Sequence, residues 1–513
     1  MWLDYLIIAL FALSLVGIAV YTRKRAGSVD DFLLAGKRGL GGWLSAFSYG
    51  TAYFSAVIFI GYAGNFGKQY GLAAVWIGIG NALIGALLAW WLLARRTKNM
   101  TSRLQAKTMP TFFERRYESA GLKLVSAVVV FVFLIPYSAS VYNGLSALFE
   151  IVFGIPGWVV MVFLAVLTAV YLFFGGYLAT ALSDFVQGII MLFGVVLMVI
   201  CFMNHAEVSW DLSELVGDIE HTWFTFGSEN TGLYGNTVSL ISLILLTSFG
   251  VFALPQTVHK YYAVRDGRAI RQGMIISTVF AAVIGFGAYF TGALSGLFPT
   301  LSGVAGDRIV PEMLAMVIPS GLLGVIAILI LSASMSTLAS VSLASASVVA
   351  VDIYKGRLRK DASDRRVNTV MRLLCLLFIL ISVTLAVLNE KLGLTAIAYL
   401  MGISWGTLAG CFIGPFVLGV VWRRVTRAAA WTSVISTLSL TAILIPLLGY
   451  GKLGFACTLG EALKAGIGCS PMIGTVCMAM SLLLTVLVSL LTKRPSDAAI
   501  YEAFDKPIEN EIK

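Results

Sequence analysis

Charged residues are scarce in this chain. Asp, Glu, Lys and Arg together make up 12% of its 513 residues, whereas 59% are hydrophobic and the mean hydropathy is +0.90. A soluble domain of this size cannot bury that much apolar surface, but helices that face lipid need not bury it. The composition therefore excludes a soluble globular protein and predicts an all-α integral membrane protein.

The chain also lacks the residue patterns of an enzyme or a metalloprotein. It has three histidines, and the sequence shows no Ser-His-Asp arrangement, metal-ligand spacing or phosphate-binding loop. Its six cysteines form no framework pattern, although Cys457 and Cys469 share the predicted outward loop 449–470, where they could form a disulfide. These absences argue against an enzyme.

Apolar segments of bilayer length recur along the whole chain. They predict about thirteen crossings, so that residues 1–491 form one transmembrane domain and residues 492–513 a cytoplasmic tail. The predicted spans are 4–21, 42–66, 71–94, 122–148, 157–175, 182–203, 236–257, 272–298, 320–350, 369–388, 393–421, 428–448 and 471–491.

The basic residues are distributed unevenly between the loops. Asp4 precedes the first span and Arg23, Lys24 and Arg25 follow it, the reverse of a cleavable signal, so we predict an uncleaved helix with its N-terminus outside. If the spans alternate from there, the cytoplasmic loops hold 28 of the 36 Lys and Arg residues and the outer loops hold 5. We expect a multi-pass cell-membrane protein whose basic loops face anionic lipid and not nucleic acid.

Two spans are interrupted at matching positions. Residues 48–56 (SYGTAYFSA) crowd small and β-branched residues into the second span, and five spans later residues 247–256 contain Gly250 and Pro255. Paired interruptions are typical of transporters built from two inverted repeats, although Gly250 and Pro255 could also mark a simple packing kink. The repeats are predicted at about 42–203 and 236–421, with flanking helices at 4–21, 428–448 and 471–491.

Residues 333–340 (ASMSTLAS) gather oxygen atoms at membrane depth. Ala333, Ser336, Thr337 and Ser340 stand at i, i+3, i+4 and i+7, which places them on one face of a helix. Clustered oxygens without a full charge suit a dehydrated monovalent cation. The alternative is that each hydroxyl bonds back to a carbonyl of its own helix.

Five short stretches of the chain form recognisable motifs: 30–38 (DDFLLAGKR), 174–179 (FGGYLA), 183–187 (SDFVQ), 254–256 (LPQ) and 335–337 (MST). Together they resemble the sodium/solute symporter family, above all its sodium/proline and pantothenate branches. The resemblance implies a LeuT-like fold: ten core helices in two inverted halves of five, with one helix before them and two after.

The resemblance also implies a principal sodium site, with Na+ as the coupling ion. Its predicted ligands are the carbonyls of Thr51, Phe54 and Ala333 and the side chains of Ser336 and Thr337. Some similar proteins hold a second sodium, for which the matching residues here are Asp184, Ser336 and Ser340. Ala339 stands where those proteins have a serine, so the second ion remains an open question.

Ionisable residues inside membrane spans are functional candidates by default. Asp184 could act as an ion ligand, a proton relay or a gate, or it could be an interfacial residue that pairs with a loop arginine. His259 and Lys260, followed by two tyrosines, are interpreted as an interfacial anchor.

Substrate contacts are expected from the first, third, sixth and tenth core helices. Their aromatic and hydroxyl residues could equally serve helix packing. No Arg or Lys lies in the middle of a cavity-lining span, so a carboxylate on the substrate would rest on half-helix N-termini. This favours a small amino acid or a small neutral solute. The candidates are Tyr53, Ser55, Tyr137, Ser140, Thr247, Val251, Gln256 and Tyr399.

The combined expectation is a sodium-coupled secondary active symporter that imports a small organic solute by alternating access. A proline-like amino acid is the first guess for the substrate, by resemblance. One alternative is a proton-coupled symporter in which Asp184 titrates, and another is a transporter-like membrane sensor. The sequence gives no sign of an obligatory protein partner, so the expected partners are the small solute and membrane lipids.

Overall fold

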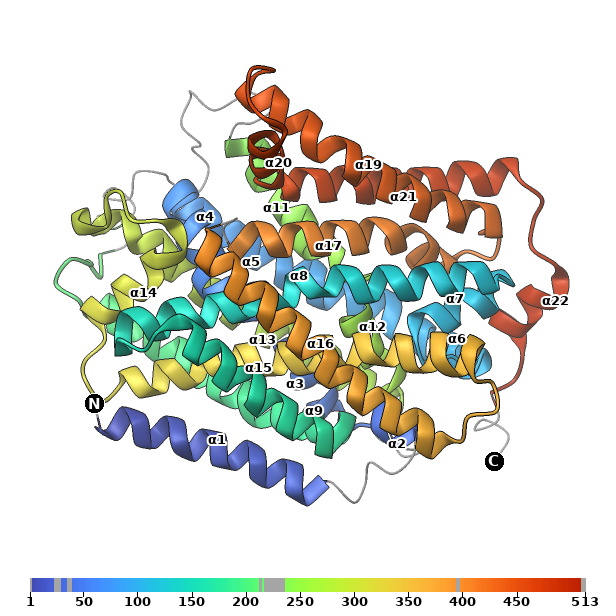
Figure 1. The fold of residues 1–513 in the computed structure, drawn as a ribbon, viewed down its shortest axis with the longest axis horizontal. Helices are drawn as coiled ribbons and strands as arrows, with labels where there is room; N and C mark the ends of the chain where they lie inside the picture. The colour runs from blue at the N-terminus through green and yellow to red at the C-terminus, as the bar shows by residue number, and fades with distance from the viewer. Residues whose placement is uncertain are drawn as a thin grey trace.

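Long helices run between the two ends of the molecule in the computed structural model (Figure 1). The structure describes residues 2–22, 29–34, 39–211, 215, 236–393 and 397–508. The basic residues Arg23, Lys24 and Arg25, residues 35–38 of the first family-like stretch and most of the loop 204–235 lie outside the described residues.

The elements follow one another in a helical series. They are α1 (Trp2–Thr22), α2 (Val29–Leu34), α3 (Gly42–Tyr53), α4 (Ala63–Tyr70), α5 (Val75–Gly80), α6 (Arg95–Arg103), α7 (Met109–Tyr117), α8 (Ala120–Phe153), α9 (Gly157–Met203), α11 (Asn236–Gly250), α12 (Pro255–Tyr262), α13 (Gly267–Ala293), α14 (Gly306–Val317), α15 (Leu323–Ser347), α16 (Asp364–Leu392), α17 (Ile397–Ile413), α18 (Gly419–Val421), α19 (Arg427–Leu453), α20 (Leu459–Ile467), α21 (Ser470–Leu491) and α22 (Asp497–Ile500). Wider π-helical turns occur at Val57–Tyr62, Asn81–Leu88, Trp90–Ala94, Val348–Leu358, Gly414–Leu418 and Tyr501–Asp505.

Among the described residues, eleven helical stretches are long and apolar enough to cross a membrane. Two of them, Val57–Arg103 and Gly157–Met203, have 47 residues each, more than twice the ~20 that one crossing requires. Each contains a glycine with positive φ, Gly71 at 53° and Gly176 at 58°, which divides it into two crossings. With α3 joined to residues 57–70 as a single crossing, the total is the predicted thirteen.

Both predicted interruptions are present. The α3 helix ends at Tyr53, and Phe54 adopts an extended conformation (φ −102°, ψ 105°) before the chain becomes helical again at residue 56. Farther along, α11 ends at Gly250, and α12 begins at Pro255, a residue suited to the first turn because it has no N–H to satisfy. These breaks confirm the two interrupted spans.

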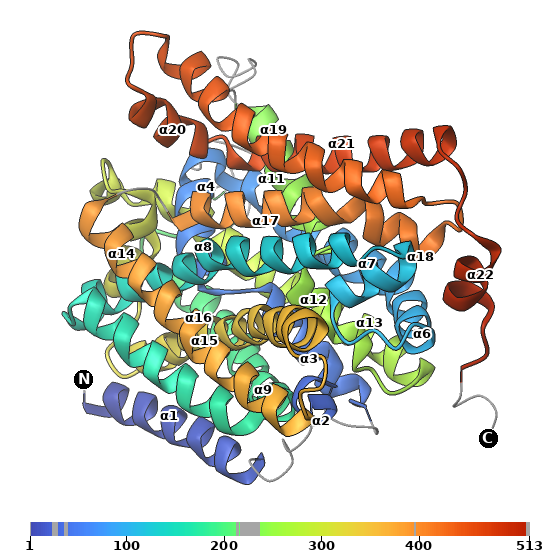
Figure 2. The ribbon, with the colours of Figure 1, turned by 45° about the vertical axis from the view of Figure 1, so that its right-hand side comes forward.

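The hydroxyl-rich helix α15 occupies the interior of the bundle. All its residues from Leu329 to Ser347 are buried, whereas α1 on the outside buries only five of its residues. Helices α3, α8, α9 and α12 pack against α15, and α19 to α21 form a separate layer beside α17 (Figures 1 and 2). Polar groups of α15 therefore face protein and not lipid.

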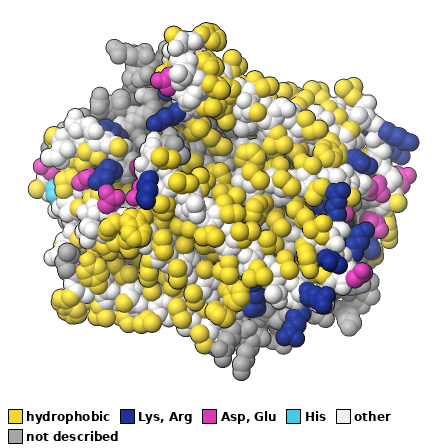
Figure 3. Space-filling model, in the orientation of Figure 1, with side chains coloured by type: hydrophobic (Ala, Val, Ile, Leu, Met, Phe, Trp, Pro, Cys, Tyr) yellow, Lys and Arg dark blue, Asp and Glu magenta, His cyan; other side chains and the backbone are white. Residues whose placement is uncertain are grey.

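More Lys and Arg side chains lie at one end of the molecule than at the other. This end carries α6, α7 and α22, and we call it the basic end; the opposite end carries α14 and α20, and we call it the α14 end (Figures 1 and 3). Helix α1 starts at the α14 end and α22 lies at the basic end, as an odd number of crossings requires. The asymmetry agrees with the basic loops in the sequence, and the orientation in the membrane stays a prediction.

Cys457 and Cys469 are both free thiols, as are the other four cysteines. The disulfide left open by the sequence is not formed in the structure.

Candidate ion and substrate site

The broken helix α3 meets α15 at a cluster of oxygen atoms. The hydroxyls of Ser336 and Thr337 donate to the Thr51 carbonyl oxygen at 3.1 Å and 3.3 Å. The Ser336 hydroxyl also lies 3.3 Å from the Ala333 carbonyl oxygen. All four residues are fully buried. We call this group the oxygen cluster, and it contains four of the five predicted sodium ligands.

The break in α3 explains why carbonyls are available here. The Phe54 N–H bonds to the Gly50 carbonyl, and this is the last hydrogen bond of the helix. The next four carbonyls, from Thr51 to Phe54, have lost their helical partners. Phe54, the fifth predicted ligand, lies at the break itself. Carbonyls released in this way inside a membrane protein need other partners, because leaving them unpaired costs several kcal/mol.

The oxygen cluster contains more acceptors than donors. The Ser336 hydroxyl faces the carbonyls of Thr51 and Ala333, and also that of Ser332 at 2.8 Å in its own helix. A hydroxyl has a single proton to share among them. The alternative, a hydrogen bond from the hydroxyl to a carbonyl of its own helix, is therefore present at Ser332, together with the contact across to α3. An alkali cation, which prefers oxygen ligands, would satisfy the remaining lone pairs.

A second group, which we call the charged cluster, lies deeper toward the basic end of the same helices. The Ser48 hydroxyl donates to Asp184 Oδ2 at 2.6 Å, and the Lys260 ammonium donates to Ser48 at 3.0 Å and to Ser340 at 2.9 Å. Lys260 Nζ lies 3.6 Å from Asp184 Oδ2. The side chains of Asp184 and Lys260 are only 1% and 2% exposed. Asp184 is therefore a buried partner of Lys260 and not an interfacial residue paired with a loop arginine.

The interpretation of His259 and Lys260 as an interfacial anchor is wrong. Both are buried, and His259 packs edge-on against the Tyr177 ring with 5.2 Å between centroids. The physical reason is the helix break: because α12 starts only at Pro255, Lys260 lies in its second turn, where α12 packs against α3 and α15. The sixth core helix thus brings a charge into the protein interior.

The two clusters share the same two helices. Ser48 and Thr51 are three residues apart on α3, and Ser336 and Ser340 are four residues apart on α15. These spacings correspond to one helical turn, about 5.4 Å. The oxygen cluster and the charged cluster are therefore neighbours along one helix interface.

Several predicted substrate residues meet around Trp405 of α17. The Tyr53 hydroxyl donates to the Thr247 carbonyl at 2.8 Å, which joins the two broken helices. The Tyr53 ring stacks on Trp405 at 6.1 Å, and the Tyr137 ring meets Trp405 edge-on at 5.5 Å. The sequence analysis did not name Trp405 as a candidate. The pattern that could have indicated it is that this aromatic residue follows the candidate Tyr399 by six positions on the same helix.

Of the other substrate candidates, one bonds within its own helix and two lie at the helix breaks. Ser140 bonds to the Tyr137 carbonyl of its own helix, so its hydroxyl serves packing. Ser55 accepts the Val57 N–H at the break in the first core helix. Val251 lies in the break between α11 and α12, where its carbonyl accepts the Thr257 hydroxyl.

The Gln256 side chain, at the start of α12, presents unsatisfied polar atoms. Its amide oxygen and nitrogen are both buried without a hydrogen-bond partner among the described residues. Buried polar groups in native proteins nearly always have a partner. A polar ligand between the broken helices and α17 would supply one.

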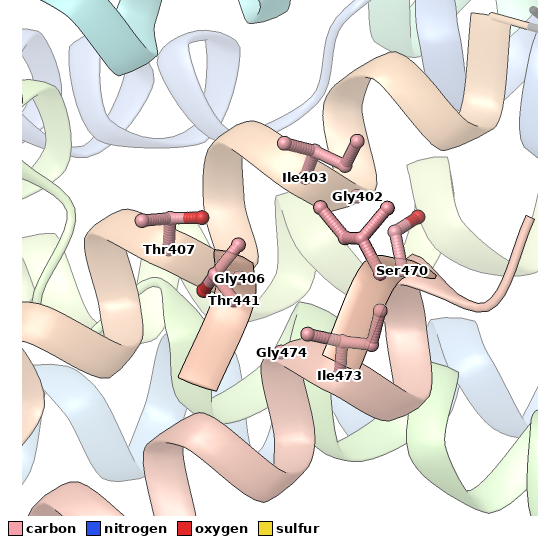
Figure 4. Close-up of a pocket in the computed structure, with 9 residues that line it drawn as sticks. Gly402, Ile403, Gly406, Thr407, Thr441, Ser470, Ile473 and Gly474 are labelled. Carbon is pink, nitrogen blue, oxygen red and sulfur yellow. The ribbon is translucent and has the colours of Figure 1, made fainter. Parts of the chain in front are cut away.

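Two hollows in the structure lie away from the oxygen cluster and the charged cluster. The cavity in Figure 4 is enclosed by α17, α19 and α21, with Thr407, Thr441 and Ser470 among its lining residues, and it contains none of the predicted ligands. A second hollow, at the α14 end, is lined by Phe66, Gln69 and Tyr399 among others. The structure therefore places Tyr399 at the wall of this hollow.

A carboxylate outside the membrane spans links three elements at the α14 end. Asp307 accepts hydrogen bonds from the Asn65 amide at 2.6 Å and from the Ile397 N–H at 3.0 Å. It thereby connects α14 to the second half of the first core helix and to α17. Burial raises the pKa of Asp307, and its two hydrogen bonds oppose that rise.

A bundle with two broken central helices and oxygen clusters between them defines a membrane transporter of the LeuT-like fold. The chain belongs to the sodium:solute symporter family, whose model matches residues 32–437. It is therefore a multi-pass membrane transporter and not an enzyme.

Relatives and solved structures agree with this membership. The chain is 28% identical to the osmoregulated proline transporter OpuE of Bacillus subtilis (strain 168), with 96% of this chain and 95% of the relative covered. It is also 28% identical to a sodium/proline symporter of Staphylococcus aureus (strain JH9), over 85% and 84% of the two chains.

Among solved structures, the fold resembles a Na+-coupled sialic acid symporter in a substrate-bound outward-open state. The TM-score is 0.73 at 18% identity, with 96% of this chain and 99% of that chain covered. Mhp1, a nucleobase-cation-symport-1 family transporter in a closed conformation, gives a TM-score of 0.52 at 15% identity over 93% and 98%. These likenesses confirm the predicted fold.

Proposed function

We propose that this protein is a sodium-coupled symporter that imports a small amino acid, with proline as the first candidate. The observation that carries the proposal is the contact between the Thr51 carbonyl and the hydroxyls of Ser336 and Thr337, across the break in α3. Na+ would bind there through the carbonyls of Thr51, Phe54 and Ala333 and the two hydroxyls. The ion would hold the broken helix against α15.

Coupling would follow from the shared geometry of the two sites. Tyr53, two residues beyond Thr51, binds the Thr247 carbonyl and stacks on Trp405. An ion that fixes the end of α3 therefore also fixes one wall of the substrate site. Such coupling is reciprocal: the substrate strengthens Na+ binding as much as Na+ strengthens substrate binding.

The substrate class is supported by chemistry at the breaks. The N-terminal end of α12 at Pro255 is the positive end of a helix dipole, which favours a carboxylate. The rings of Tyr53, Tyr137 and Trp405 offer an apolar wall for a compact side chain. The proline-transporting relatives favour proline within this class.

Flux measurements in proteoliposomes test the proposal. Radiolabelled proline should accumulate under an inward Na+ gradient and should accumulate more with an inside-negative potential, which supplies about 2.3 kcal/mol per charge for each 100 mV. Replacing Na+ with K+ should abolish accumulation. Uptake that persists without Na+ under a proton gradient would establish proton coupling instead, and binding without flux would establish a sensor.

A thermal-shift screen identifies the substrate if proline is not transported. A ligand that binds the folded protein raises its apparent stability by mass action. Small amino acids, neutral solutes and monocarboxylates should be compared in Na+ and in K+ buffers. The true substrate is expected to stabilise the protein more in Na+ than in K+.

We also propose that the basic end faces the cytoplasm, with residues 492–513 as a cytoplasmic tail. The partly exposed thiol of Cys457 would then lie outside. A membrane-impermeant maleimide should label it in intact cells, and Cys457→Ser should remove that labelling. Labelling only after the membrane is opened would reverse the orientation.

A further inference from the structure

We propose that the Lys260 ammonium is a built-in cation that takes the place of a second sodium ion, so that the transporter binds one Na+ per cycle. The inference rests on the proposed sodium coupling. It starts from three contacts of Lys260 Nζ: Ser340 Oγ at 2.9 Å, Ser48 Oγ at 3.0 Å and Asp184 Oδ2 at 3.6 Å.

The oxygens of the charged cluster form a cation site in their own right. One carboxylate and two serine hydroxyls converge from α9, α3 and α15, and both charged side chains are almost fully buried. Hard monovalent cations prefer oxygen ligands of this kind. The oxygens are coordinated here by an ammonium group, which is a compact point charge with three donors.

The charges leave no room for a second cation beside Lys260. Asp184 contributes one negative charge and Lys260 one positive charge, so the pair is neutral. A sodium ion added to the same oxygens would lie beside the Lys260 ammonium, and no further negative charge is present there to offset their mutual repulsion. The Ser48 hydroxyl is also committed, because it donates to Asp184 at 2.6 Å and accepts from Lys260.

An aromatic ring also contacts the ammonium. The Tyr177 ring centroid lies 5.1 Å from Lys260 Nζ, within the range of a cation–π contact. Tyr177 follows Gly176, whose positive φ of 58° redirects α9 at this point. Helices α3, α9, α12 and α15 therefore all contribute to the position of one amine.

A tethered cation differs from sodium in one functional respect. Lys260 cannot leave the protein, so it adds no ion to the transport stoichiometry, although it neutralises Asp184 in the way a sodium ion would. Ala339 left open whether a second sodium ion binds. On this inference the oxygens of the second site are present, and Lys260 of α12 is the cation that binds them.

Equilibrium binding of ²²Na+ to the purified protein, without substrate, tests the inference. The wild type should bind one Na+ per chain. Lys260→Met, which keeps the length of the side chain and removes its charge, should bind two and should gain an Na+-dependent rise in melting temperature with a second, separable midpoint. Lys260→Arg retains the charge and should bind one.

The outcomes separate this inference from the proposed function. Two ions on the wild type, or a folded Lys260→Met protein that still binds one, would overturn it. If Lys260→Met does not fold, the ²²Na+ count on the wild type still tests the inference, because two ions per chain would overturn it. A wild type that binds no Na+ would refute sodium coupling, while the gain of a site in Lys260→Met would still be measurable.

Discussion

Ser336 on α15 lies 3.1 Å from the carbonyl oxygen of Thr51 on α3, although the two residues are 285 positions apart. The contact exists because α3 stops at Tyr53 and releases its last carbonyls into the protein interior. It joins the helix that breaks to the helix with the most hydroxyl groups, and it provides the first test of the ion site.

Removing either hydroxyl of the oxygen cluster should weaken sodium binding. Ser336→Ala and Thr337→Ala each delete one ion ligand, so we expect the Na+ concentration for half-maximal uptake to rise about ten-fold, or about 1.4 kcal/mol. Ser334→Ala is the matched control, because the Ser334 hydroxyl bonds only to the Ile330 carbonyl of its own helix. An equal change in the control would contradict a ligand role.

Tyr53→Phe should weaken substrate binding more than folding. Without its hydroxyl, Tyr53 can no longer tie α3 to the Thr247 carbonyl, a loss of about 1 kcal/mol that corresponds to roughly five-fold in KM. Tyr49→Phe is the comparison, since the Tyr49 hydroxyl likewise bonds a backbone carbonyl, that of Gly85. The site assignment fails if both variants change the KM of uptake equally.

Gly292→Ala should loosen the packing of α13 against α4. A Cβ at Gly292 would lie 2.1 Å from the Ala63 carbonyl oxygen, which is backbone and cannot move aside. Overpacking of this kind costs about 1–3 kcal/mol, so the melting temperature in detergent should fall. Gly296→Ala, with nothing within 4 Å of the new methyl group, should leave it within error. Equal melting temperatures for the two variants would contradict this close approach.

Asp266 should make stability depend on pH at the start of α13. Its carboxylate accepts the Ala269 N–H at 2.8 Å and pairs with Arg265, and these contacts hold its pKa below the usual value. A carboxyl whose folded pKa is lowered stabilises the protein above its unfolded pKa, and this contribution disappears as pH falls through the folded pKa.

Asp266→Ala should therefore cost about 1 kcal/mol near neutral pH, the usual value of a helix N-cap. The difference from wild type should shrink in acid. Asp266→Asn keeps a capping oxygen and should be stable but insensitive to acid at this site. Chemical unfolding of wild type and Asp266→Ala between pH 3 and pH 7 would measure this difference in unfolding free energy. A difference that stays constant across that range would exclude a contribution from the Asp266 carboxylate.

The sequence by itself determined the class of the protein and the helices that carry its site. Apolar length predicted about thirteen crossings, because a bilayer accepts only segments that satisfy their own backbone. Small residues near Thr51, together with Gly250 and Pro255, predicted both helix breaks. The spacing from Ala333 to Ser340 predicted a hydroxyl face, because helical periodicity is a local property.

Only the tertiary structure decided which distant groups meet. The sequence offered Lys260 as a surface anchor, since a basic residue near the end of an apolar span usually lies at the interface. The structure instead packs α12 against α3 and α15, and Lys260 reaches Asp184, Ser48 and Ser340 there. The meeting depends on four helices packed together, and no local pattern encodes that arrangement.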